Sequence, residues 1–150
     1  MARIEFVDVK DTQFVKVLDL YPDGDPEAEK MKAKIPSEEL EGQAVRFIVP
    51  GGPEALQLFE VKCDPDVQFN THAHDEDEII YVTQGSIVLG KREHGVGSAI
   101  MIPGKTLYGF KSGAEGLTFL NFRAAADFTY ITRDELMQER AESGSAAQPA

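Results

Sequence analysis

The chain has 150 residues, a length that suits one domain around a single hydrophobic core. Its 26 acidic and 15 basic residues give a formal net charge of -11, which would repel nucleic acid phosphates and anionic membranes, so we expect neither as a partner. The apolar runs are far shorter than the roughly 20 residues of a membrane helix, and the polar start does not resemble a signal peptide, which predicts a cytoplasmic protein.

The first 55 residues are expected to pack on the main domain as covering structure. Residues 4–6 and 14–18 have short strand-like patterns. After a turn signal, Asp25 is placed to cap a short helix that has Pro26 in its first turn and extends to about Lys34.

Residues 56–126 consist of short β-branched and aromatic runs separated by turn residues about every ten positions, which indicates an antiparallel sandwich or barrel. Gln84-Gly85 and Ser112-Gly113 lie where hairpin turns are expected. Cys63 is the single cysteine, so an intrachain disulfide is excluded. Its strand-like surroundings predict a small buried residue without a functional role.

Residues 127–142 are expected to form a C-terminal strand and helix. Thr132 to Glu135 spells a capping box, which predicts a helix that continues to about Glu142. The tail 143–150 is small and polar, and we expect it to be disordered.

The stretch from residue 70 to 78 carries the pattern that points to chemistry. In a strand His72 and His74 lie on one face, and Glu78 keeps that parity if the ladder resumes after the acidic turn. Two imidazoles and one carboxylate leave other coordination positions open, which suits one divalent transition metal: iron first, with zinc, manganese or nickel as alternatives. The competing interpretation places both histidines at a strand edge beside a solvated acidic loop, but residue type, spacing and parity together favour the metal.

Two stretches resemble the two motifs of the cupin superfamily: His72-x-His74-x3-Glu78-x6-Gly85 and Gly97-x5-Pro103. The resemblance implies an all-β double-stranded β-helix, a jelly-roll barrel, with short N-terminal and C-terminal helices. It also implies that His72, His74 and Glu78 bind the metal. A homodimer, with N-terminal strands crossing between the chains, is a further expectation from the resemblance.

This sequence departs from the cupin pattern at three positions. Asp66 and Lys105 replace motif glycines, and Tyr108 occupies the position of the third histidine. Three roles stay open for Tyr108: a phenolate ligand to the metal, an acid or base beside the metal, or a buried structural tyrosine. His94 lies in a turn before the second motif, and we place it outside the site.

The barrel interior is expected to be a mostly apolar pocket for a small organic molecule. Its expected lining is Ile80, Met101, Ile102, Phe110, Phe119 and Phe122. Four lysine or arginine side chains could bind an anionic substrate. Long charged side chains at strand ends usually face solvent, and we expect the same of these four. They are Arg46, Arg92, Lys105 and Arg123.

The leading functional hypothesis is a metal-dependent enzyme acting on a small organic molecule, an oxidoreductase of the dioxygenase type if the ion is iron. Glu78 and Tyr108 are its expected catalytic residues. The first alternative is a lyase, isomerase or decarboxylase in which the metal acts as a Lewis acid and Tyr108 moves a proton. The second is a non-catalytic binding or carrier protein. The cupin superfamily hosts many activities, so the resemblance implies the scaffold and not the reaction.

Overall fold

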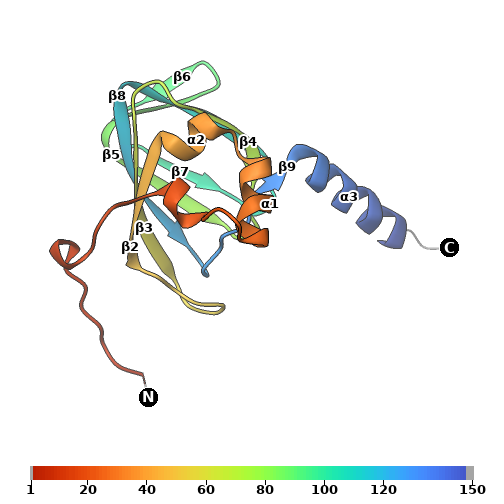
Figure 1. Ribbon diagram of the computed structural model, residues 1–150, viewed down its shortest axis with the longest axis horizontal. Coiled ribbons are helices and arrows are strands. Elements are labelled where there is room, and N and C mark those ends of the chain that lie inside the picture. The colour runs from red at the N-terminus through yellow and green to blue at the C-terminus, as the bar shows by residue number, and fades with distance from the viewer. Residues whose placement is uncertain (1, 148–150) are drawn as a thin grey trace.

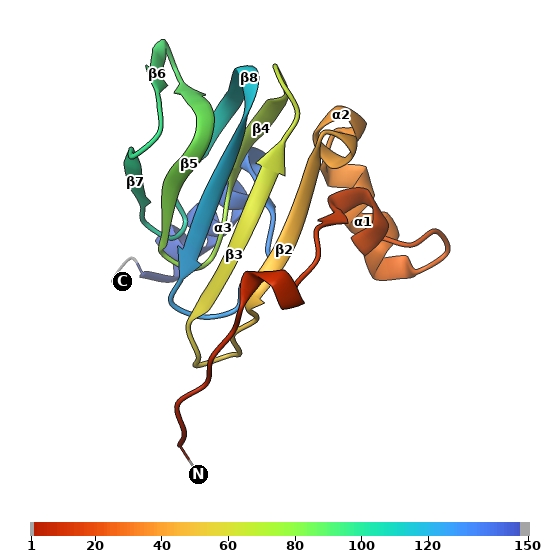
Figure 2. The same cartoon turned by 90° about the vertical axis from the view of Figure 1, so that its left-hand side faces the viewer.

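The computed structural model describes residues 2–147 and shows an antiparallel β-barrel with helices on one side (Figure 1). The sheet has the order β1-β2-β3-β8-β4-β9, and β5 joins it through β8 while also pairing with β6 and β7. Figure 2 shows β5, β8, β3 and β2 side by side. The strands are β1 (Val15–Lys16), β2 (Gln43–Val49), β3 (Gln57–Cys63), β4 (Gln68–Ala73), β5 (Glu78–Leu89), β6 (Arg92–His94), β7 (Ala99–Ile102), β8 (Tyr108–Arg123) and β9 (Ile131–Thr132). The predicted all-β fold is confirmed.

The barrel strands bury alternate side chains, as the period of two in a strand requires. Val61 and Cys63 of β3 are buried together with Ile80 and Val82 of β5. Glu78 has the parity of Ile80 and Val82 and is only 2% exposed. The strand pattern therefore carries the carboxylate of Glu78 into the barrel.

The two longest strands, β5 and β8, bend where hairpin turns were expected. Gln84-Gly85 lies inside β5 and Ser112-Gly113 inside β8, and the register between the two strands shifts at this level. Gly85 has φ +67°, and a Cβ at this position would stand 2.0 Å from the backbone oxygen of Gly116. The hairpin interpretation is wrong, because these positions mark a close crossing of two continuous strands that only glycine permits.

Two short helices, α1 (Pro26–Lys34) and α2 (Ser37–Glu41), precede β2. The predicted cap of α1 is confirmed, since the Asp25 carboxylate accepts a hydrogen bond from the Ala28 N–H at 2.9 Å. Ile35 and Leu40 pack with Tyr130 in a second small core. This second core joins the helices to the segment that leads into β9.

The N-terminal segment forms less strand than expected. Residues 4–6 form no strand, and of 14–18 only β1 does, next to the 3-10 turns η1 (Val9–Asp11) and η2 (Val17–Leu20). Ile4 and Phe6 are 83% and 93% exposed, and Figure 2 shows this segment extending away from the barrel. A strand needs a neighbouring strand to pair with, and residues 4–6 have none in the described chain.

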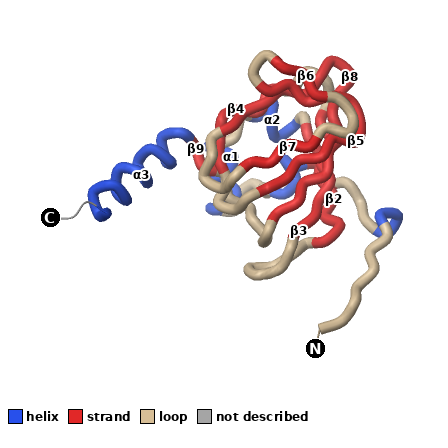
Figure 3. Tube along the Cα trace, turned by 180° about the vertical axis from the view of Figure 1, so that it is seen from behind, coloured by secondary structure: helices blue, strands red, loops and turns tan. Residues whose placement is uncertain are grey.

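The C-terminal helix α3 (Arg133–Ala147) begins at the predicted capping box. The Thr132 N–H and hydroxyl donate to Glu135 Oε1 at 3.2 and 3.0 Å, and the Glu135 N–H donates back to Thr132 Oγ1 at 3.2 Å. The helix continues beyond Glu142 through Ala147, where the sequence predicted disorder, and residues 148–150 lie outside the described chain. Figure 3 shows α3 projecting from the barrel. Among the described helices, none has the length and hydrophobicity needed to cross a membrane.

Candidate active site

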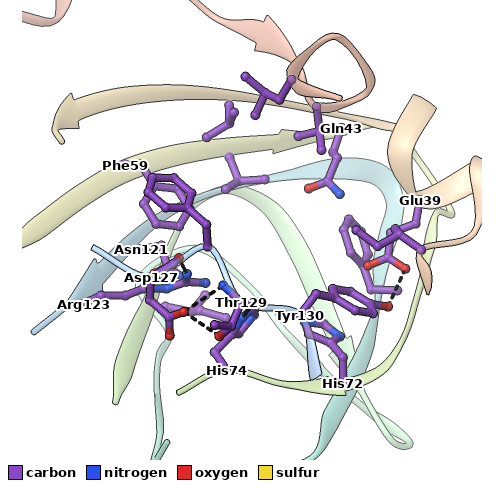
Figure 4. A pocket seen from close by; sticks show the side chains of 18 of the residues that line it. Glu39, Gln43, Phe59, His72, His74, Asn121, Arg123, Asp127, Thr129 and Tyr130 are labelled. Atoms are coloured by element: carbon purple, nitrogen blue, oxygen red, sulfur yellow. Dashed lines mark hydrogen bonds between the residues drawn. The ribbon is translucent and has the colours of Figure 1, made fainter. Parts of the chain in front are cut away.

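A cavity of about 150 Å³ lies inside the barrel, bounded by the sheet and by the segments that carry α1, α2 and β9. Its walls are mostly apolar and include three predicted lining residues: Ile80, Phe110 and Phe119. Its polar groups come from six separate segments of the chain: Tyr21, Glu39, Gln43, His72, His74, Tyr108, Asn121, Arg123, Asp127, Thr129 and Tyr130. Figure 4 shows most of these side chains.

Two predicted lining residues lie on the other face of the sheet. Met101 and Phe122 are 57% and 44% exposed, so their assignment to the cavity is wrong. Both pair with Ile79, the outward-facing neighbour of Ile80, which explains their orientation. Ile102 is buried in the adjoining core.

The two histidines of the motif face the cavity with their Nε2 atoms available. His72 lies in β4 and His74 directly follows that strand. Nδ1 of His72 lies 2.6 Å from the carbonyl oxygen of Asn70, and Nδ1 of His74 lies 2.5 Å from that of Thr129. Because a carbonyl oxygen can only accept, each Nδ1 carries the proton and each Nε2 is the basic nitrogen. Neither Nε2 has a hydrogen-bond partner within residues 2–147.

Both imidazoles are neutral at pH 7. Burial lowers the pKa of His72 to about 4, and the neighbouring His74 contributes to this shift. Burial also lowers the pKa of His74, with a further contribution from the Arg123 guanidinium. The ring centroids of the two histidines lie 4.8 Å apart. The cavity therefore contains two adjacent, uncharged bases.

Tyr108 lies beside these bases on β8. It pairs with His72 across the β4–β8 ladder, and its ring centroid is 4.9 Å from that of His72 and 6.2 Å from that of His74. Its hydroxyl donates a hydrogen bond to Oε1 of Glu78. Burial and the negative charge of Glu78 raise the pKa of Tyr108 well above 10. These surroundings favour the neutral phenol over the phenolate.

The carboxylate of Glu78 is already surrounded by donors. Besides the Tyr108 hydroxyl on Oε1, Oε2 accepts hydrogen bonds from Nε of Arg123 at 3.0 Å and from Nδ2 of Asn121 at 3.2 Å. Nη2 of Arg123 also lies 3.0 Å from Oε2. The side chains of Glu78 and Arg123 are 1% and 8% exposed. They form a buried ion pair in which the guanidinium supplies the positive charge.

The predicted metal ligands His72, His74 and Glu78 do not converge on one point. Within residues 2–147, no group of three or more His, Cys, Asp or Glu side chains is placed to hold a metal ion. The two imidazoles meet, but both oxygens of Glu78 are bonded to other groups. The residues do not fit a three-ligand centre in this arrangement, so metal binding stays a prediction.

The segment between β8 and β9 closes over this polar cluster. Nη1 of Arg123 donates to the carbonyl oxygen of Asp127. The Asp127 carboxylate accepts hydrogen bonds from the N–H of Glu76 at 2.8 Å and from the N–H of Thr129 at 2.9 Å. The carbonyl of Thr129 in turn holds Nδ1 of His74. Arg123 is therefore linked through the backbone to the orientation of His74.

Arg123 was expected to face solvent, and this prediction is wrong. It pairs directly with Glu78 across the β5–β8 ladder, so both side chains point into the barrel. The available sequence signal was that Asn121 and Arg123 share the parity of Leu117 and Phe119, which indicates two polar groups on the buried face. Glu39 and Tyr130 were also missed, and they lie in segments without a motif.

The other predicted cations have structural partners or face solvent. Arg46 is only partly exposed and lies 2.8 Å from Glu60, so its expected solvent-facing position is wrong. Lys105 forms ion pairs with two carboxylates, and Arg92 is exposed as predicted. His94 lies in β6, away from the cavity lining.

Neither the protein-family models nor the curated proteins contain a match to this sequence. Among solved structures, the polyketide cyclase RemF from Streptomyces resistomycificus is similar over 92% of this chain and 94% of its own, with 21% identity and a TM-score of 0.61. An RmlC-like cupin protein from Ralstonia eutropha JMP134 has 15% identity and a TM-score of 0.61 over 99% of this chain and 92% of its own. A protein with a cupin-like fold from the same organism has 14% identity and a TM-score of 0.59, over 100% and 96%.

These similarities extend over nearly the whole of each chain, so they include the helices and β9 as well as the barrel. The protein therefore has the fold of the cupin superfamily.

Proposed function

We propose that this protein is an enzyme that transfers a proton on a small, mainly apolar carbonyl compound bound inside the barrel. The observation that carries the proposal is the pair of neutral imidazoles beside the Tyr108 phenol in a mostly apolar cavity. A cavity of about 150 Å³ has room for roughly one aromatic ring. Tyr108 acts here as an acid, which is one of the three roles predicted for it.

In the proposed reaction, Nε2 of His72 or His74 takes a proton from a carbon next to the carbonyl group. The electron pair of that C–H bond moves toward the carbonyl oxygen, which receives a hydrogen bond from Tyr108 as its hydroxyl turns from Glu78. Return of the proton to another carbon gives isomerisation, and departure of a neighbouring group gives elimination. Attack of the carbon on a second carbonyl group of the same molecule closes a ring, and the new alkoxide takes the proton from the imidazolium. RemF is named a polyketide cyclase. Glu78 acts here as a positioning residue for Tyr108.

The proposal predicts that the protein exchanges carbon-bound protons of suitable ketones with solvent. Acetophenone and 4'-hydroxyacetophenone in D₂O are the probes, and deuterium uptake at the carbon next to the carbonyl is followed by NMR. We expect protein-dependent exchange that falls at least about 100-fold in the double variant His72→Gln/His74→Gln, because loss of a general base typically costs this much. His94→Gln, outside the cavity, is the matched control and should keep the wild-type rate.

Equal exchange in the wild type and the double variant would contradict the proposal. Binding of the probes without any exchange would instead support the carrier interpretation. Tyr108→Phe should also slow exchange, whereas Tyr81→Phe, on the outer face of β5, should not. Thermal melts of all variants check that each one is folded.

A metal-dependent enzyme, oxygenase-like or Lewis-acid, is the second candidate. It is favoured by the carbonyls of Asn70 and Thr129 that hold Nδ1 of both histidines, because metal-ligating histidines usually donate their other N–H in this way. Glu78 would have to leave Arg123 to act as the third ligand. After incubation with iron, zinc, manganese or nickel, this candidate predicts close to one bound ion per chain and its loss in His72→Ala. Chelator treatment separates the two candidates, since only the metal-dependent one predicts loss of activity.

We also propose a homodimer through an apolar row on the outer face of the sheet. The row follows the strand register from Val49 to Leu58, Phe122, Ile79 and Met101, across β2, β3, β8, β5 and β7. Four of these side chains are at least 39% exposed, and the residues together line a groove with an almost wholly apolar surface. A continuous apolar patch of this kind usually marks an interface.

A second copy of the chain fits this groove because the chain itself offers a complementary segment. Ile4 and Phe6 project from the extended N-terminus with few contacts to their own barrel. We expect sedimentation velocity to show a dimer for the wild type and a monomer for Met101→Glu/Phe122→Glu. Val96→Glu changes an even more exposed apolar side chain outside the row and should leave the dimer intact. If the wild type is still a monomer at about 50 µM, a concentration at which even a weak dimer should form, this assembly is contradicted.

A further inference from the structure

Glu39 is a buried carboxylate in the cavity that the proposed proton transfer does not use. It lies in α2 and is only 2% exposed. Its Oε2 accepts hydrogen bonds from the Asn70 N–H at 3.2 Å and from the Tyr130 hydroxyl at 3.3 Å. Burial raises the pKa of Glu39 to about 7. No lysine, arginine or histidine within residues 2–147 forms an ion pair with it.

The other oxygen of this carboxylate, Oε1, is free to meet a ligand. It has no hydrogen-bond partner in the described part of the chain. If Oε1 were also fully enclosed, it would be a buried polar atom without a partner. Among the described residues the only such side-chain nitrogen or oxygen is Nε of Arg46. Oε1 of Glu39 therefore still contacts open space, and the cavity is the space that Glu39 lines.

Glu39 lies away from the guanidinium and amide that hold Glu78. Figure 4 shows Glu39 at one side of the pocket and Asn121 and Arg123 at the other, with Tyr130 and His72 between them. The rings of Tyr130 and His72 are stacked, with centroids 4.4 Å apart and an interplanar angle of 7°. A ligand that reaches from the histidines along Tyr130 would bring its far end to Glu39.

We infer that Oε1 of Glu39 recognises a hydroxyl group of the substrate, so that the substrate class is a small aromatic carbonyl compound with a hydroxyl at the end away from the carbonyl. Above pH 7 Glu39 is ionised, and a carboxylate oxygen can only accept, so in this pH range Oε1 selects a hydrogen-bond donor. A neutral hydroxyl also suits a cavity whose walls are mostly apolar. The position of the carbonyl rests on the proposed function, whereas recognition of the hydroxyl rests on Glu39 alone.

A buried acceptor of this kind discriminates against ligands that leave it without a donor. The probes are 4'-hydroxyacetophenone and 4'-methylacetophenone, which have nearly the same shape and differ in the donor. At pH 7.5, above the pKa of Glu39, we expect wild-type protein to bind the hydroxyl compound at least about tenfold more tightly, as measured by titration calorimetry. This measurement needs no turnover.

Two variants of Glu39 test the assignment. Glu39→Gln keeps an oxygen for Asn70 and Tyr130 but removes the charge, and the preference for the hydroxyl compound should fall below about threefold. Glu39→Met removes the acceptor and should abolish the preference. Glu41→Gln makes the same charge change on the exposed end of α2 and should keep the tenfold preference.

The binding preference tests the Glu39 site, and proton exchange tests the proposed function, so the two can succeed or fail independently. A preference that survives in His72→Gln/His74→Gln while exchange is lost would support both. A preference without exchange in the wild type would support the Glu39 site and contradict the proton-transfer proposal. Equal affinity of the wild type for both probes, no binding of the hydroxyl compound at millimolar concentration, or an unchanged preference in Glu39→Gln would each overturn the assignment.

Discussion

Replacing Arg123 with methionine is expected to destabilise the fold by about 3–5 kcal/mol, because removal of one partner leaves a buried charge without compensation. Arg123 is the ion-pair partner of Glu78 and also donates to the backbone of Asp127. Its guanidinium lies 5.0 Å from the Phe59 ring centroid, so methionine keeps part of the packing. Urea denaturation followed by circular dichroism measures the change in the free energy of unfolding.

The double variant Arg123→Met/Glu78→Gln should recover at least half of that loss, since neutral glutamine needs no counter-charge. The control is Lys34→Met, which removes a partly exposed ion pair with Glu135 and should cost less than about 1 kcal/mol. A loss below about 1 kcal/mol in Arg123→Met, or no recovery in the double variant, would show that the pair is not the source of the stability.

His72 and Glu39 are expected to make the stability depend on pH with opposite signs. The pKa of His72 is lowered to about 4, so its neutral form contributes stability above pH 6.5 that is lost as the pH falls toward 4. The pKa of Glu39 is raised to about 7, so its protonated form contributes stability below pH 4.5 that is lost as the pH rises through 7. At about 1.4 kcal/mol for each pKa unit, either effect is of the order of 3 kcal/mol.

Urea denaturation between pH 4 and 7 in the presence of a chelator tests this expectation by comparing each variant with the wild type. From pH 4.5 to 7 the wild type should lose stability relative to Glu39→Gln, and from pH 4 to 6.5 it should gain stability relative to His72→Gln. Glu41→Gln and His94→Gln should show flat differences. Differences of the same sign for the two buried residues would contradict the assigned pKa shifts.

The parts of the site that lie close together in the sequence were predictable. Strand parity placed His72 and His74 on one face, and the structure has both facing the cavity. The cap at Asp25 and the capping box at Thr132 depend on residues only three positions apart, so local chemistry decides them. The barrel itself was predicted from short strand patterns and from the resemblance to two cupin motifs.

The parts that depend on long-range contacts were not predictable from local pattern. Glu39 enters the cavity because α2 packs beside β4, and Tyr130 arrives from a segment 91 residues further along. Arg123 looked like a surface cation because nothing near it in the sequence reveals its partner, which lies 45 positions away. The same partner occupies the Glu78 carboxylate that the motif had assigned to a metal.

The two ends of the long strand β8 meet at a single side chain, Glu78. A straight strand of 16 residues would separate Tyr108 from Arg123 by roughly 50 Å, yet both bond to the one carboxylate of Glu78. The strand therefore curves around the barrel, and the side chain of Glu78 connects its two ends. A substrate that draws the Tyr108 hydroxyl away would break one of these two contacts and leave Glu78 bonded only to the far end of the strand, through Asn121 and Arg123.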